Sequence, residues 1–326
     1  MNTSSLTTNR TDDLILTLNA PYTSIEIVIA VTATLGNLLV CVAVIQDRKL
    51  RTVTNYFLVS LSLADVCVGA IAIPCAILTS IGLPHNNLKL CTLMLSILTM
   101  LTLSSTLSLV SIAVDRYIAI LNPLRYKSIM TPRNTFICIL CSWSLSAVGG
   151  LLPVMGWHKS PSTHRCLFTQ VIDMTYMVFF FTFIIFVLPL TSMLLIYARI
   201  FSEVRRQIQV TAKLVTKDSS AGKKETGIKR EIKTATSLFT IVFLFVVCWA
   251  PLHVMNALIL FCLPCYIPPI LLDTAIILSH ANSALNPILC AYKLKSFRNK
   301  FIAVFCHRNN NIKPGAQAAH HSNIFT

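Results

Sequence analysis

The sequence feature that constrains the fold most is a stretch of about 23 residues without a charged side chain, between Cys91 and Asp115. A membrane-spanning helix needs roughly 20 apolar residues at a rise of about 1.5 Å per residue, and buried helices of soluble proteins are seldom so long and so apolar. The adjacent Asp115 and Arg116 would be costly inside a bilayer, so we expect them at its face, with a function there. The stretch therefore predicts a transmembrane helix with an ionic group at one end.

Six further apolar segments occur along the chain. Together they predict an all-α protein, a bundle of seven transmembrane helices with mostly short connections and no inserted soluble domain. The approximate limits of the seven segments are 24–46, 54–81, 91–117, 134–156, 174–201, 234–261 and 268–292. The predicted organisation is an extracellular tail (1–23), the transmembrane domain (24–292), a short amphipathic helix (293–306) and a cytosolic tail (307–326).

The segment after the seventh span and the longest linker are both basic. Phe297, Phe301 and Phe305 recur every four residues among basic residues, which predicts an amphipathic helix on the membrane surface. Cys306 follows it and is a candidate for palmitoylation, with a free cytosolic thiol as the alternative. The linker 202–233 is polar and basic, and we expect it to extend the flanking helices at its two ends.

The charge distribution predicts the orientation in the membrane. Charged residues make up only 12% of the chain, whereas soluble domains carry about 25%. The formal net charge of +15 could indicate nucleic-acid binding, but only four of the 27 Lys and Arg residues lie on one side of the predicted bundle: Arg10, Lys89, Lys159 and Arg165. Because basic residues gather on the cytoplasmic side, the pattern predicts a multi-pass plasma-membrane protein with an extracellular N-terminus. The basic excess then reflects topology, and contact with membrane lipid or a cytosolic partner, not nucleic acid.

The N-terminal segment is consistent with this orientation. Residues 1–20 are polar and lack the apolar core of a signal peptide, so the first span is expected to act as its own insertion signal. Asn2 and Asn9 each begin an Asn-x-Ser/Thr sequon, which predicts glycosylation in an extracellular tail.

Each apolar segment also contains a polar or proline feature. Taken singly, an intramembrane proline indicates no more than a kink, and an Asn or Trp no more than a packing contact. Together, in this order across residues 24–306, they resemble the rhodopsin-like G-protein-coupled receptors. The features in chain order are Gly36-Asn37, Asp65, Asp115-Arg116-Tyr117, Trp143, Pro189, Trp249-Ala250-Pro251 and Asn282 to Pro287.

The resemblance implies a switch at the cytosolic face. Arg116 would pair at rest with Asp115 or Glu231, and movement of the sixth segment would open a crevice for a heterotrimeric G protein. Arrestin is a further cytosolic partner that the resemblance implies. The implied switch residues are Asp115, Arg116, Tyr117, Glu231, Pro251 and Pro287.

Asp65 is a carboxylate in the middle of an apolar segment, where an acid is expected to be functional. The resemblance implies a sodium-ion pocket around it, and oxygen-rich ligation suits such a hard cation. The alternative is a hydrogen-bond network without an ion, and the two states could alternate between the active and the resting receptor. No other cofactor is expected. The implied pocket consists of Asp65, Ser105, Trp249, Asn282, Ser283 and Asn286.

Two pairs of cysteines lie in predicted outer loops. The resemblance implies a disulfide between Cys91 and Cys166, and an oxidising compartment favours it. Cys262 and Cys265 have no pair of histidines near them, which favours a local disulfide over a zinc site. The remaining cysteines lie within apolar segments and are expected to pack as small apolar residues.

The third segment has no acidic residue before Asp115, which disfavours a charged amine as the ligand. The sequence from Trp249 to Asn256, the sequence from Ile276 to Ser283, and Glu26 eleven residues before Asn37 resemble the adenosine receptors specifically.

The resemblance implies a role for each matching residue. Asn256 would form a bidentate amide contact with the N6/N7 edge of adenine, and Phe168 would stack on the purine. Glu26 would bind His280 and fix its tautomer, and His253 would lie beside the ribose or the base. Apolar walls would come from Leu252, Met177 and Ile276, and contacts to the ribose hydroxyls from Thr102, Ser279 and His280.

Four positions depart from the family pattern. The family usually has Glu, Asn, Gln and Tyr at these positions. This chain has Thr169, Phe181, Leu103 and Cys290 instead. The first three make one pocket less polar, and the fourth affects activation. Two functions remain open. One is a receptor for extracellular adenosine that acts through heterotrimeric G proteins to alter cyclic AMP, and the other is a related receptor with a different small-molecule ligand or weakened signalling.

Two other classes of protein are disfavoured. A transporter or channel would be expected to have inverted hydropathy repeats, paired broken helices or a ring of charged pore residues. An enzyme would need a tighter set of catalytic or metal-ligating groups than the few scattered acids and histidines of these segments.

Overall fold

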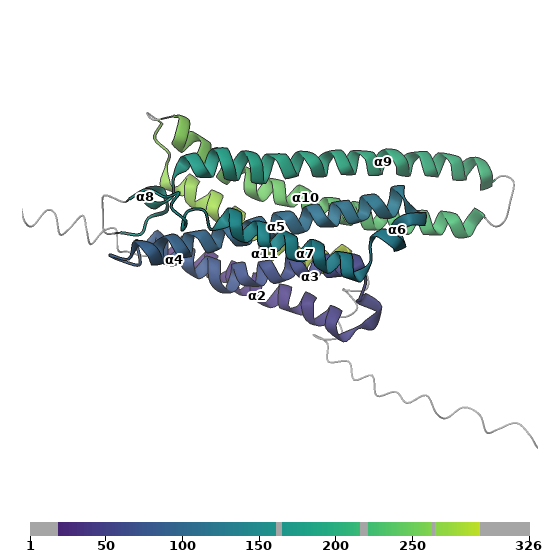
Figure 1. Ribbon diagram of the computed structural model, residues 1–326, viewed down its shortest axis with the longest axis horizontal. Helices are drawn as coiled ribbons and strands as arrows, with labels where there is room; N and C mark the ends of the chain where they lie inside the picture. Colours follow the sequence, from purple (N-terminus) through teal and green to yellow (C-terminus); the bar gives the residue numbers. More distant parts are fainter. Residues whose placement is uncertain (1–18, 161–164, 216–220, 263–264, 294–326) are drawn as a thin grey trace, which may run out of the picture.

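The computed structural model describes residues 19–160, 165–215, 221–262 and 265–293. Within these ranges the chain is helical almost throughout, and the long helices lie side by side in one bundle (Figure 1). The predicted all-α fold is confirmed. The α-helices are α2 (Ala20–Gln46), α3 (Val53–Cys67), α4 (Ile73–Ser80), α5 (Leu88–Leu121), α6 (Pro123–Ile129), α7 (Pro132–Gly150), α8 (Phe168–Val171), α9 (Leu188–Val215), α10 (Ala221–Phe261) and α11 (Pro269–Lys293).

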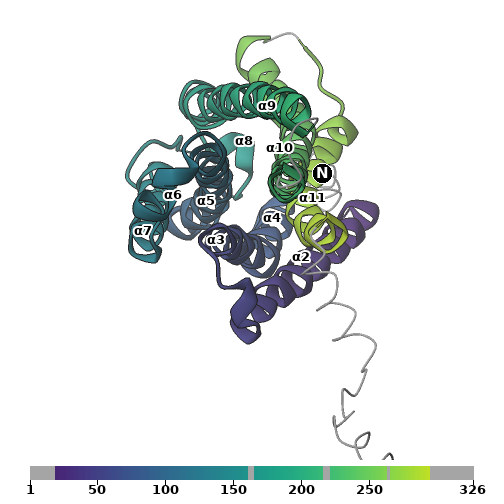
Figure 2. The ribbon, with the colours of Figure 1, turned by 90° about the vertical axis from the view of Figure 1, so that its right-hand side faces the viewer.

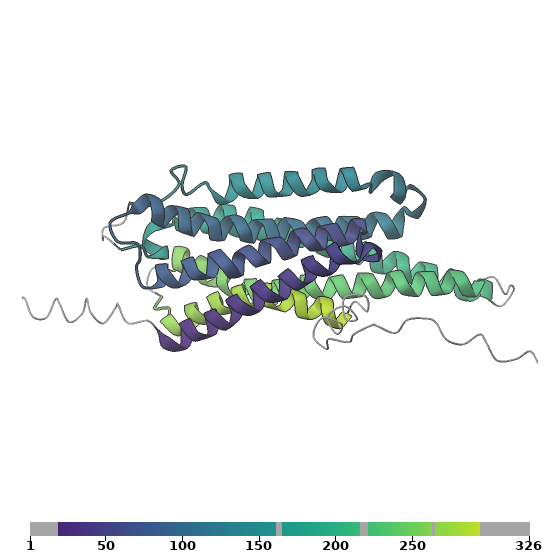
Figure 3. The ribbon, with the colours of Figure 1, turned by 90° about the horizontal axis from the view of Figure 1, so that it is seen from below.

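Two of the predicted segments contain a π-helical stretch. The second segment runs through α3, the π-helical stretch Val68–Ala72 and α4, and the fifth begins with the π-helical stretch Tyr176–Val187 before α9. Seen along its length the bundle forms a ring (Figure 2), and α5 contacts α3, α7, α9 and α10. α2 lies beside α11 and closes the ring (Figure 3).

Polar side chains begin several of the long helices. The Asn19 side chain accepts a hydrogen bond from the Tyr22 backbone N–H at the start of α2, and Asn87 does so from Leu90 at the start of α5. Thr131 caps α7 in the same way, with proline at the first helical position. Because the first backbone N–H groups of a helix have no partner within it, these side chains fix where each helix begins.

The helices differ from the prediction at the end of the fourth segment and agree with it at the long linker. The fourth segment was expected to continue to residue 156, but α7 ends at Gly150. Pro153 accounts for the difference, because the residue before a proline is disfavoured in the α conformation. α9 reaches Val215 and α10 begins at Ala221, so the linker extends both flanking helices, as predicted.

The bundle exposes apolar residues and buries polar ones, most clearly in α7. This helix buries Thr135, Ser146, Gly149 and Gly150. It exposes Phe136, Ile137, Leu140, Leu145 and Val148. A helix surrounded by lipid tails gains nothing by turning its large apolar residues inward, and small residues let it approach its neighbour closely.

Five described helical segments are long and apolar enough to cross a membrane. α7 and α11 are not among them, and the polar residues of α11 include Asp273, His280 and two asparagines, Asn282 and Asn286. The five segments are Ala20–Gln46, Val53–Ser80, Leu88–Leu121, Tyr176–Val210 and Phe239–Phe261.

Replacing Gly150 by alanine is expected to destabilise the bundle by about 1–3 kcal/mol, the usual cost of overpacking. A Cβ atom at this position would lie 2.3 Å from Cα of Met100 on α5, so backbone would have to move. The thermal unfolding temperature of the detergent-solubilised protein checks this. Ser144→Ala, on the exposed face of the same helix, should leave that temperature unchanged, and equal temperatures for both variants would contradict the prediction.

Several predicted features lie outside the described residues. These are the amphipathic helix 293–306 with Cys306, and the two glycosylation sites at Asn2 and Asn9.

Candidate functional site

A cavity of about 260 Å³ opens near the end of the bundle that holds the disulfide between Cys91 and Cys166, here called the disulfide end. Its wall is mostly apolar, with a few polar groups, as is usual for small-molecule sites. Eight of the ten predicted ligand-binding residues line it, so the tertiary structure brings together residues from four separate spans and one loop. They are Thr102, Phe168, Met177, Leu252, Asn256, Ile276, Ser279 and His280.

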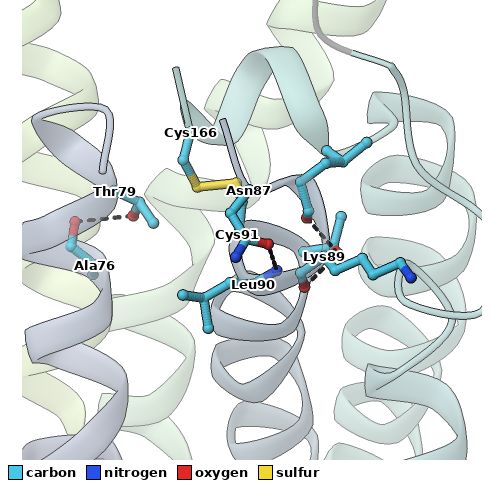
Figure 4. The surroundings of a disulfide bond; sticks show 9 residues. Ala76, Thr79, Asn87, Lys89, Leu90, Cys91 and Cys166 are labelled. Atoms are coloured by element: carbon cyan, nitrogen blue, oxygen red, sulfur yellow. Dashed lines mark hydrogen bonds between the residues drawn. A yellow bond between two sulfur atoms is a disulfide. The ribbon is translucent and has the colours of Figure 1, made fainter. Parts of the chain in front are cut away.

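The disulfide holds one wall of the cavity in place. Cys91 lies in the first turn of α5 and Cys166 in the facing loop, with their Cα atoms 5.6 Å apart (Figure 4). The Cys166 backbone N–H also donates to the Gly82 carbonyl oxygen at 2.9 Å. Phe168, two residues further on, begins the short helix α8 and lines the cavity. The second pair, Cys262 and Cys265, also forms a disulfide, just after α10.

Asn256 contributes a buried side-chain amide to the cavity wall. Its side chain is 1% exposed and lines the cavity, and among the described residues neither Nδ2 nor Oδ1 has a hydrogen-bond partner. A buried polar group without a partner costs about 1–3 kcal/mol, so such groups are rare and need an explanation. An adjacent donor and acceptor facing a cavity can bind a ligand that presents the complementary pair.

His280 is held by Glu26 across the contact between α2 and α11. Its Nδ1 atom lies 2.9 Å and 2.8 Å from the two carboxylate oxygens, and both side chains are buried. A carboxylate accepts hydrogen bonds, so Nδ1 carries the hydrogen and donates it. In the neutral ring this leaves Nε2 as an acceptor. Glu26 itself does not line the cavity, so it acts on a ligand only through His280.

Two hydroxyl groups of the wall are also fixed by hydrogen bonds. Thr102 donates to the Leu98 carbonyl oxygen at 3.0 Å, and Ser279 donates to the Ile276 carbonyl oxygen at 2.7 Å. Each hydroxyl has only one hydrogen. Both oxygens therefore face the cavity as acceptors and suit a ligand that donates hydroxyl groups.

His253 was predicted to lie beside the ribose or the base, and the structure places it behind the residues that line the cavity. His253 is absent from the described cavity wall, and it stacks on Phe186 with the ring centres 4.1 Å apart. Its Nδ1 shares a hydrogen bond of 2.8 Å with Thr182 Oγ1, and Thr182 donates to the Met177 carbonyl oxygen at 2.9 Å. The single hydrogen of Thr182 is thus used, so His253 donates from Nδ1.

Thr182 is the hydrogen-bond partner of His253 next to the cavity, and the sequence did not reveal it. The π-helical stretch Tyr176–Val187 turns Phe181 to the cavity and places Thr182 against His253. Irregular helices of this kind leave no periodic pattern, although they often occur at functional sites. The one signal in the sequence was a single threonine within the apolar run 176–187.

Asp65 accepts hydrogen bonds from three predicted partners. They come from Ser105 at 3.3 Å, from Ser283 at 2.8 Å and from the Asn286 amide at 2.7 Å. Trp249 and Asn282 are buried as well, but no described hydrogen bond joins either of them to Asp65. The structure therefore contains a hydrogen-bond network around Asp65, which is the arrangement given above as the alternative to a bound sodium ion. The carboxylate, hydroxyl and amide oxygens are also ligands that suit a hard cation.

Comparison with known proteins agrees with this arrangement. The family described as "7 transmembrane receptor (rhodopsin family)" matches residues 36–289. The human adenosine receptor A2a is 41% identical over 298 residues, which cover 86% of this chain and 71% of that receptor. The adenosine A2a receptors of dog and horse are each 40% identical over the same shares.

The chain belongs to the adenosine receptor family. It is therefore a seven-transmembrane, multi-pass receptor of the rhodopsin class and not an enzyme. The predicted family is confirmed.

At the opposite end of the adenosine-receptor bundle, Arg116 lies in a network centred on Asp115. Arg116 donates to Asp115 from Nε at 3.0 Å and from Nη2 at 2.7 Å. Thr54 and Tyr126 donate to the same carboxylate at 2.7 Å and 2.9 Å, and Arg116 also donates to Thr54. Burial, with a smaller contribution from Asp115, raises the pKa of Tyr126, which keeps its hydroxyl hydrogen in place for this bond. The structure thus places Arg116 with Asp115, one of its two predicted partners.

The remaining predicted switch residues lie on the helices that were expected to carry them. Tyr117 follows Arg116 on α5, and Pro251 and Pro287 lie inside α10 and α11. Glu231 belongs to α10, but its side chain is outside the described part of the receptor. Thr54 and Tyr126 had no predicted role, because their importance depends on a contact between α3, α5 and α6.

Proposed function

We propose that this receptor binds extracellular adenosine in the cavity at the disulfide end and signals through heterotrimeric G proteins to alter cyclic AMP. The observation that carries the proposal is the buried amide of Asn256 in the cavity wall, which has no hydrogen-bond partner among the described residues. Adenine presents an amino group at N6 and an acceptor at N7, the pair that an amide binds in bidentate fashion. The curated relatives carry the name adenosine receptor, which agrees with this ligand.

The rest of the cavity supplies complementary contacts. Phe168 offers an aromatic face on which the purine stacks, between apolar walls. Ribose hydroxyls donate to the fixed acceptors of Thr102 and Ser279, and His280 binds the ribose in the orientation that Glu26 imposes. Leu252, Met177 and Ile276 form the apolar walls.

Adenosine binding at the disulfide end changes the conformation at the opposite end of the bundle. Adenosine favours the conformation that it binds more tightly. In that conformation Arg116 leaves the Asp115 network and α10 moves, so that a G-protein helix can enter. Pro251 and Pro287 lie inside the helices that rearrange. We further propose that the receptor spans the plasma membrane with its N-terminus outside the cell and glycans on Asn2 and Asn9. Residues 293–306 lie on the inner leaflet with a palmitoyl group on Cys306, and arrestin binds the cytosolic face.

The experiment that tests the function measures saturable binding of a radiolabelled purine agonist, together with adenosine-dependent nucleotide exchange on a purified heterotrimeric G protein. Membranes expressing the intact receptor should show both. Surface expression without binding would contradict the proposal.

A second ligand class is supported by one observation. Thr169 and Phe181 both line the cavity, where the family pattern has Glu and Asn. These residues make the wall less polar, which favours a purine with an apolar substituent or a related small molecule. Displacement of the label by such compounds, but not by adenosine, would favour this alternative.

We also propose that Asp65 holds a sodium ion in the resting receptor, with Ser105, Ser283 and Asn286 as nearest partners and Trp249 and Asn282 in the surrounding shell. The ion would neutralise the carboxylate and stabilise the conformation that binds agonist weakly.

Asp65→Asn is expected to abolish the effect of sodium chloride on agonist affinity, because the amide cannot supply the charge that attracts the ion. Agonist competition curves with sodium chloride and with potassium chloride at equal ionic strength measure the effect. Agonist affinity in the intact receptor should fall when sodium replaces potassium. A variant that keeps the full sodium effect would rule out Asp65 as the site.

A further inference from the structure

The cavity wall contains one carboxylate that the proposed adenosine contacts do not use. Asp273 lies in the second turn of α11 and is half-buried at the cavity. Among the described residues of the wall, Asp273 is the only acid, and none is Lys or Arg. A ligand in this cavity therefore meets the Asp273 carboxylate and, among the described residues of the wall, no Lys or Arg side chain, while the one histidine, His280, is already bound to Glu26.

Asn19 holds the carboxylate in place. The Asn19 Nδ2 atom donates to Asp273 Oδ2 at 3.0 Å, across 254 residues of sequence. The Oδ1 atom of Asn19 accepts from the Tyr22 backbone N–H, so the same amide caps α2 and binds α11. A carboxylate can accept about four hydrogen bonds. The Asn19 bond uses one position and leaves the group able to bind a donor from the cavity.

A second carboxylate lies close behind the same wall. Glu26 is four residues after Tyr22 on α2, and Tyr22 itself lines the cavity. Glu26 is bound to His280, whereas Asp273 lies seven residues before His280 on α11, about two turns nearer the disulfide end. Charges in a cleft with apolar walls act on a ligand more strongly than charges on an open surface. The α2–α11 side of the cavity mouth is thus built to attract positive charge.

We infer that Asp273 selects the ligand by charge, so that a purine carrying a protonated amine on its base binds more tightly than the same purine with a neutral group. The inference rests on the proposed purine site and adds a specificity-determining residue to it. The amine and the Asp273 carboxylate form an ion pair at the cavity mouth, while Asn256 and Phe168 hold the base.

Two matched probes test the charge preference. Both are adenosines with a short alkyl chain on C2, because the Asn256 contact would occupy N6 and N7. One chain ends in a primary amine, and the other ends in its neutral acetamide. In the intact receptor the amine should bind about three- to tenfold more tightly than the acetamide, which is the size expected for a partly exposed ion pair.

Asp273→Asn should bring the ratio of the amine and acetamide affinities close to one. The affinity for adenosine itself should change less than about threefold. Asp173→Asn removes an acid of the loop at the same end that is not part of the cavity wall, and it should preserve the ratio. An amine preference that survives Asp273→Asn would overturn the inference.

The ratio of amine to acetamide affinity in the intact receptor provides a second test, which does not require any variant to fold. Raising potassium chloride from about 0.1 to 1 M shortens the screening length from roughly 10 to 3 Å, so the amine preference should decrease. A preference unaffected by salt, or no preference at all, would overturn the inference while the purine site stands. Failure of the intact receptor to bind any purine probe would overturn the proposed function, and the inference with it.

Discussion

Asn256→Ala is expected to weaken purine binding about 10- to 100-fold, since a bidentate amide contact to adenine contributes roughly 1–3 kcal/mol. The amide is buried in the cavity wall, and both of its polar atoms lack partners among the described residues. A ligand with the complementary donor and acceptor relieves the desolvation cost of this buried amide. Saturation binding of a radiolabelled purine agonist measures the loss.

Two controls make this prediction specific. Asn134→Ala makes the same change on the exposed start of α7, far from the cavity, and should leave the affinity unchanged. A purine riboside without the N6 amino group should bind the intact receptor weakly and should lose little more in the Asn256 variant, because the two changes remove the same contact. Equal losses for both ligands would mean that Asn256 recognises another part of the molecule.

Glu26→Leu is expected to lower nucleoside affinity by about 10- to 100-fold, because it leaves the Nδ1–H of His280 buried without an acceptor. Both side chains are buried, and the two nitrogen–oxygen distances of 2.9 Å and 2.8 Å fix the orientation of the ring. Glu26→Gln should cost much less, since its amide oxygen still accepts from Nδ1. Competition binding with adenosine, at matched surface expression, compares the two variants.

A double variant decides whether Glu26 acts through His280. If it does, Glu26→Leu combined with His280→Leu should lose about as much affinity as His280→Leu alone, because the contacts belong to one unit. Additive losses would mean that Glu26 affects the cavity by another route. Equal losses for Glu26→Leu and Glu26→Gln would show that the charge of Glu26 matters and its acceptor oxygen does not.

The fold was predictable because membrane helices leave a strong signal in sequence. Long uncharged runs predicted the bundle, and the linker ends extended the helices as expected. The boundary at Gly150 was missed, since the apolar composition continues past the helix and only Pro153 marks the change. The eight cavity-lining residues were identified through the adenosine-receptor resemblance, which depends on residue type and order and needs no knowledge of helix rotation.

The sequence by itself determined which segments form the long helices, and it predicted their orientation in the membrane and the polar residues of the site, such as Asn256, Glu26 and His280. The tertiary structure alone decided which of these face the cavity. A π-helical stretch places Thr182 against His253, which lies outside the described cavity wall. The packing of α2 on α11 brings Asn19 to Asp273. These contacts depend on small rotations of whole helices, and such rotations are set by packing between residues far apart in the chain.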